Sequence, residues 1–79
     1  MVHTKAYEEI IFFIAAGSTP EQVIAFRPSQ EVQNRVRELV DREKNTSLSA
    51  EEQSELNNYL LLEHLMRMAK ARARQILAS

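Results

Sequence analysis

The chain has 79 residues, 44% of them hydrophobic, with no cysteine, one glycine and two prolines. A single domain of this size has a small core, which disulfides, metal sites or self-association often supplement. Without cysteine there are no disulfides and no thiolate metal sites, so self-association is the supplement that remains. The net charge of -1 provides no overall field for a polyanion, so nucleic acid would need a local patch. The longest apolar run, 10–16, is well short of the roughly 20 residues that span a bilayer. We therefore expect a cytoplasmic protein that enters no membrane and holds no cofactor.

The first part of the chain predicts two helices. Thr4 is placed to cap a helix over 5–16, and Gly17 stands where a left-handed residue would end it. A short helix over 20–26 follows Thr19, because proline comes next and glutamine stands three residues on. The first helix is apolar nearly all round, so we expect both its own domain and another chain to cover it, with an ordinary core helix as the alternative.

The second part predicts a helical hairpin with unequal arms. A helix over 30–44 begins after a serine, and a helix over 50–78 begins after a second serine that has glutamate three residues on. At 1.5 Å per residue the second arm is about 43 Å long, about twice the first, so the first arm ends near Glu63. From Leu65 onwards the longer helix needs another cover. The N-terminal helix is the candidate for that place.

Charged side chains four residues apart predict ion pairs within the first arm. Three pairs have this spacing, namely Glu31 with Arg35, Arg37 with Asp41 and Glu38 with Arg42. On this interpretation the arginines belong to a solvated helix face and form no nucleic-acid surface.

These features predict an all-α fold of one domain over 1–79. It consists of the hairpin with its long C-terminal helix and the apolar N-terminal helix, and we expect it to assemble as a dimeric bundle. The side chains assigned to the core or to a dimer seam are Ile10, Phe12, Phe13, Ile14, Leu65, Met66 and Ile76.

A second apolar flank of the long helix, formed by Leu60, Leu61 and Met68, surrounds His64. It adjoins a basic stripe formed by Arg67, Lys70 and Arg74. Aromatic and methionine side chains suit protein-binding surfaces, so the flank is either a docking surface or a homodimer seam with no further role. The basic stripe could bind phosphate or an acidic groove on a protein. Glu63 partly neutralises its charge, however, which favours the interpretation that the stripe is simply a solvent-exposed face of the helix. The candidate partner-binding residues are Tyr59, Leu61, His64, Arg67, Met68, Lys70 and Arg74.

His64 is the residue that invites a catalytic interpretation. Its neighbour Glu63 faces 100° away along the helix, so the two cannot share one substrate or metal ion. A zinc-binding helix would need a second histidine four residues away, where Leu60 and Met68 stand. With no glycine-rich phosphate loop and no cysteine nucleophile, we expect no enzyme and no metal site.

One spaced pattern extends over 23–77. It comprises Ile24-Ala25-Phe26-Arg27-Pro28-Ser29, Gln33-x-Arg35, Leu48-Ser49-x-Glu51-Glu52-x-x-Glu55-Leu56-x-x-Tyr59, Leu62-Glu63-His64-Leu65 and Lys70-Ala71-Arg72-Ala73-Arg74. This pattern resembles that of a family of small bacterial proteins often described as antitoxins encoded beside a nuclease toxin. The resemblance implies a protein that binds and neutralises such a toxin, and it leaves operator DNA binding open. It assigns no toxin-contacting residue, and 1–16 lies outside it.

Three functions therefore stand as hypotheses. The first is an antitoxin-like protein that binds a partner toxin. The second is a homo-oligomeric structural or scaffold protein, and the third is a DNA-binding regulator that acts through its basic C-terminal helix.

Overall fold

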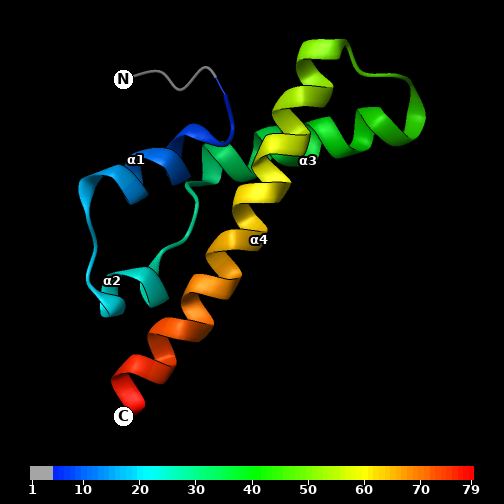
Figure 1. Ribbon diagram of the computed structural model, residues 1–79. Coiled ribbons are helices and arrows are strands. Elements are labelled where there is room, and N and C mark those ends of the chain that lie inside the picture. The colour runs from blue at the N-terminus through cyan, green and yellow to red at the C-terminus, as the bar shows by residue number, and fades with distance from the viewer. Residues whose placement is uncertain (1–4) are drawn as a thin grey trace.

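The computed structural model describes residues 5–79 and is all-α within that range (Figure 1). None of the helices in this part of the chain combines the length and the apolar character needed to cross a membrane. The helices, in chain order, are α1 (Glu8–Ala16), α2 (Pro20–Ala25), α3 (Gln30–Asn45) and α4 (Ala50–Ala78).

Helix α1 is shorter than predicted at its N-terminal end. Thr4, the expected cap, lies outside the described residues, and a turn precedes the helix, in which the Glu8 N–H donates to the Lys5 carbonyl oxygen at 3.2 Å. Gly17 ends the helix with a φ of 78°, a backbone conformation that favours glycine. The predicted C-terminal boundary is therefore confirmed, and the N-terminal boundary differs by three residues.

Side-chain caps determine where the other helices begin. Ser29 Oγ accepts the Val32 N–H at 3.2 Å, and Ser49 Oγ accepts the Glu52 N–H at 3.1 Å. The Glu52 carboxylate in turn accepts the Ser49 N–H at 3.0 Å, and Thr19 begins α2 with the same reciprocal arrangement. These bonds satisfy backbone donors that a helix leaves unpaired at its start.

Helices α3 and α4 form the predicted hairpin and cross at an angle (Figure 1). Leu39 on α3 and Leu56 on α4 are fully buried, with 0% and 1% of their surface exposed. Val32, near the start of α3, shares the central core with Tyr59. The contact between the two helices therefore extends along α4 as far as Tyr59. This is about one helical turn before Glu63, near which the first arm was expected to end.

Helix α2 covers most of the second half of α4, and α1 reaches only its beginning. Its contact with α4 is the most extensive between any two helices of residues 5–79, and Ala73 on that part of α4 is only 4% exposed. The expectation that the N-terminal helix would lie against α4 from Leu65 onwards holds only for the beginning of that stretch, where Ile10 packs with Met66. Helix α1 lies higher, beside the middle of α4, where Ile10 meets Tyr59 and Met66 in the central core (Figure 1).

Two arginines of α3 reach across to α4. Arg35 forms ion pairs with Glu38 and with Glu55 on α4, at 3.0 Å for the second. Arg42 forms an ion pair with Glu52, also on α4, at 2.6 Å. The predicted pairs with residues four positions away are wrong for both arginines, because the neighbouring helix offers carboxylates within reach of these long side chains.

Candidate functional site

The seven predicted partner-binding residues lie on two different sides of α4. Nine positions separate Tyr59 from Met68, which is two and a half turns at 100° per residue, so the two side chains leave the helix on opposite sides. Tyr59 is only 3% exposed and belongs to the core, so it supplies the floor of a site and not an exposed anchor. Leu61, His64 and Met68 are exposed on the outer side, whereas Arg67 and Lys70 border a cleft on the other.

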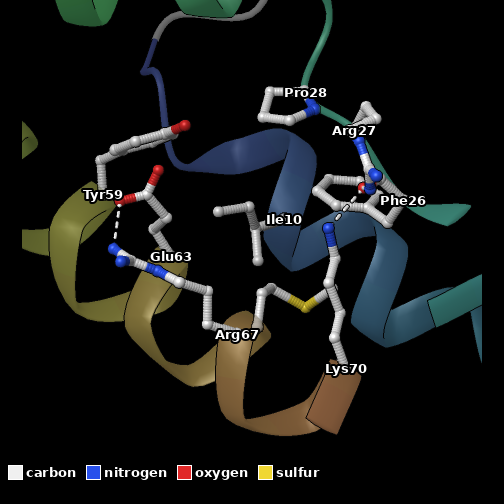
Figure 2. A pocket seen from close by; sticks show the side chains of 9 residues that line it. Ile10, Phe26, Arg27, Pro28, Tyr59, Glu63, Arg67 and Lys70 are labelled. Atoms are coloured by element: carbon white, nitrogen blue, oxygen red, sulfur yellow. Dashed lines mark hydrogen bonds and ion pairs between the residues drawn. The ribbon is translucent and has the colours of Figure 1, made fainter. Parts of the chain in front are cut away.

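This cleft, here called the basic cleft, has a volume of about 510 Å³. It lies between the middle of α4, helix α1 and the segment that joins α2 to α3 (Figure 2). Its lining combines apolar and charged side chains, namely Ile10, Phe26, Arg27, Pro28, Tyr59, Glu63, Met66, Arg67 and Lys70.

The floor of the basic cleft is part of the hydrophobic core. Ile10, Tyr59 and Met66 are exposed by only 2%, 3% and 5%. Burial raises the pKa of the Tyr59 hydroxyl, and the negative charges of Glu63 and Glu9 raise it further. A group entering the cleft would therefore meet a firm apolar and aromatic surface below a charged rim.

Two cations donate to the same carbonyl oxygen at the edge of the cleft. Lys70 Nζ and Arg27 Nη1 lie 2.8 Å and 2.7 Å from the Phe26 carbonyl oxygen (Figure 2). Within residues 5–79, neither cation forms an ion pair with a carboxylate. Burial lowers the pKa of the Lys70 amine, and the positive charges of Arg27 and Arg74 lower it further. The arrangement therefore concentrates positive charge without a counter-ion.

Arg67 differs from these two cations because it has an acidic partner. Its Nη2 lies 2.9 Å from Glu63 Oε1, one turn earlier on α4, and both side chains are substantially exposed. The excess of positive charge at the basic cleft consequently comes from Arg27 and Lys70, with Arg74 close enough to act on Lys70.

The outer side of α4 carries large apolar side chains that residues 5–79 leave exposed. Leu61 is 66% exposed, Met68 54%, and Leu60 and Leu65 45% each. We call these four residues the apolar face. A shallow hollow of about 340 Å³ continues it towards α1 and α2, and its lining comprises Phe13, Ile14, Ser18, Val23, Leu65, Met66 and Ala69.

The residues assigned to a core or dimer seam also divide into two groups. Ile10 and Met66 are buried, and Phe13 packs against Phe26 with ring centroids 4.5 Å apart. The others are about half exposed, namely Phe12, Ile14, Leu65 and Ile76.

Arg27 is the main residue of the cleft that was not predicted. In the sequence it follows a short helix and precedes Pro28, which indicates only a helix end. The tertiary fold brings it to Lys70, 43 positions later in the chain. The one feature of the sequence that pointed to Arg27 was its place in the Phe26-Arg27-Pro28 part of the pattern that resembles the antitoxin family.

His64 is exposed beside the apolar face. Within residues 5–79, no three side chains of histidine, aspartate or glutamate come together in a way that could hold a metal ion. Comparison with family models, curated proteins and solved structures finds no match to this chain.

Proposed function

We propose that this chain is a non-enzymatic protein-binding module that buries the apolar face of α4 against a different protein. The observation that carries the proposal is the group of four neighbouring apolar side chains that are 45% to 66% exposed on one helix. Contiguous apolar surface of this kind marks interaction sites in small proteins, because leaving it in water is unfavourable.

Charge supports a partner of different sequence over a second copy. Leu60, at the edge of the apolar face, lies two turns before Arg67, at the edge of the basic cleft, so the two surfaces adjoin along α4. A second copy would bring the same uncompensated cations to this region, whereas an acidic partner would balance them.

The resemblance over 23–77 supports a toxin as that partner. On this proposal the chain is an antitoxin-like protein that neutralises a nuclease-type toxin by covering part of its surface. DNA binding through α4 has less support, because Arg67 is paired with Glu63 and the Lys70 amine is directed to the Phe26 carbonyl oxygen.

Co-expression with the product of the neighbouring gene tests the proposal. We expect the two proteins to co-elute in size-exclusion chromatography, with a mass by light scattering that accounts for both. Leu61→Asp and Met68→Asp should each abolish co-elution while far-ultraviolet circular dichroism keeps its helical signal, since a charge would be buried in the interface.

Asn34→Asp is the matched control, because it adds the same charge at an exposed position of α3. It should leave co-elution unchanged. Persistence of the complex in both α4 variants would contradict the proposal. A stable homodimer that excludes the second protein would favour the scaffold hypothesis instead.

A further inference from the structure

We infer that the basic cleft receives a carboxylate side chain, an aspartate or glutamate, of the partner protein. This inference rests on the proposed function for the identity of the partner, and on the geometry of the cleft for the chemistry of the ligand. It assigns Arg27 and Lys70 as the residues that bind the carboxylate.

The positions of the two cations carry the inference. Both donate to one carbonyl oxygen, at 2.7 Å and 2.8 Å, and neither meets a carboxylate within residues 5–79. A carbonyl oxygen carries only a partial negative charge, so two full positive charges beside it remain unbalanced. If Lys70 turns to an incoming carboxylate, Phe26 still keeps the hydrogen bond from Arg27.

The lining of the cleft favours a carboxylate on a short hydrocarbon stem. Ile10, Tyr59 and Met66 provide an apolar floor that suits methylene groups, while the cations stand at the edge. The volume of about 510 Å³ is ample for one such side chain.

The charge of the cleft selects a single carboxylate over a polyphosphate chain. Glu63 lines the same cleft as Arg67 and pairs with it, which leaves Arg27 and Lys70 as the uncompensated lining cations. A nucleic-acid backbone would also approach Glu63, and that contact is repulsive. A protein carboxylate can enter beside the cations and leave Glu63 in water.

The chemistry can be tested on the isolated protein by nuclear magnetic resonance. The probe is N-acetylglutamate N-methylamide, and its neutral counterpart N-acetylglutamine N-methylamide is the control ligand. We expect saturable millimolar binding of the glutamate probe, with shifts of the amide signals of Phe26, Arg27 and Lys70, and no saturable shift with the glutamine probe.

Variants locate the effect. Lys70→Gln and Arg27→Gln should each weaken binding of the glutamate probe at least fivefold. The control Arg72→Gln, an exposed basic position of α4 that does not line the cleft, should change it less than twofold. Equal binding by wild type and Lys70→Gln, or tighter binding of inorganic phosphate than of the glutamate probe, would overturn the inference.

Affinity measurements on the complex with the partner distinguish failure of this inference from failure of the proposed function. Lys70→Gln and Arg27→Gln should weaken the complex at least tenfold, and Arg72→Gln should not. If Leu61→Asp abolishes the complex while Lys70→Gln and Arg27→Gln leave its affinity unchanged, the carboxylate inference fails and the protein-binding function stands. If no complex forms although the glutamate probe binds the cleft, the proposed function fails and the ligand chemistry stands.

Discussion

Arg35 and Glu55 form a two-point ion pair between α3 and α4. Arg35 Nε lies 3.2 Å from Glu55 Oε2, and Nη2 lies 3.0 Å from Oε1. Glu55 is only 2% exposed, and its Oε2 also accepts the Ala6 N–H at 2.9 Å. One buried carboxylate therefore joins both arms of the hairpin and the N-terminal segment.

Replacement of Arg35 by methionine should destabilise the protein. Among residues 5–79, the change leaves the buried Glu55 carboxylate with the Ala6 N–H as its one hydrogen-bond donor. We expect the free energy of unfolding, measured by urea titration, to fall by about 2 kcal/mol, less than for a fully buried pair because Arg35 is partly exposed. The control Arg37→Met, exposed on α3, should stay within about 0.5 kcal/mol of wild type. A similar result for both variants would contradict the stabilising role of Arg35.

Acid should weaken the fold through Glu55. Burial alone raises the pKa of this carboxyl, but hydrogen bonds from Arg35 and the Ala6 N–H outweigh it and hold the pKa below its ordinary value. Since the folded state then binds fewer protons than the unfolded state, the stabilisation is complete above the ordinary pKa and is lost as pH falls below about 4.3. Urea titrations between pH 7 and pH 3 should show this decline.

In the same series Glu55→Gln should show a shallower decline with pH than wild type, from a lower starting stability. Glu52 maintains part of the slope, because the Ser49 N–H and Arg42 also lower its pKa. The control Glu43→Gln, exposed on α3, should keep the full wild-type slope. An unchanged slope in Glu55→Gln would refute the assignment.

Truncation of leucines should separate the core from the apolar face. Leu39 is 0% exposed, so Leu39→Ala should lower the free energy of unfolding by about 2 to 4 kcal/mol through lost burial and a cavity. Leu61 is 66% exposed, and Leu61→Ala should change it by less than about 0.5 kcal/mol. A large loss for Leu61→Ala in the isolated protein would mean that a second copy already covers the apolar face.

The cap of α4 has a measurable contribution of its own. Ser49→Ala removes the acceptor of the Glu52 N–H, which should lower the free energy of unfolding by about 1 kcal/mol. Ser47→Ala, at an exposed position of the same turn, is the control and should have little effect. Equal losses in the two variants would show that the turn itself, and not the cap, is responsible.

Lys70→Gln should not destabilise the isolated protein. The lowered pKa of Lys70 shows that its positive charge is disfavoured in the folded state, and Arg27 maintains the hydrogen bond to the Phe26 carbonyl oxygen. We expect an unfolding free energy within about 0.5 kcal/mol of wild type or higher, which would separate a binding defect from unfolding. A loss above about 1 kcal/mol would assign Lys70 a structural role.

The sequence predicts the helices well because their signals are local. Ser29 and Ser49 each begin a helix at the expected place, and Gly17 ends one. These signals depend on residues within a turn of each other, so they act in the same way in any fold. Helix α4 runs unbroken to Ala78, as its pattern predicts.

The contacts between helices could not be predicted in the same way. Arg35 has acidic residues four and three positions away, and only the register of the hairpin decides that it meets Glu55, 20 positions later. Arg27 lies in a non-helical segment whose position depends on how α2 docks. Helical spacing predicts the basic stripe of α4. It does not predict that other parts of the chain lie beside the stripe and form a cleft with it.

The hydrogen bond between the Ala6 N–H and Glu55 has a consequence for synthesis of the protein. Its two residues are 49 positions apart, so the segment around Ala6 is synthesised well before its docking site on α4. At a translation rate of about 5 to 20 residues per second, this delay is roughly 2 to 10 s. During this delay Ile10 of α1 lacks the side chains of Tyr59 and Met66 that bury it in the folded protein.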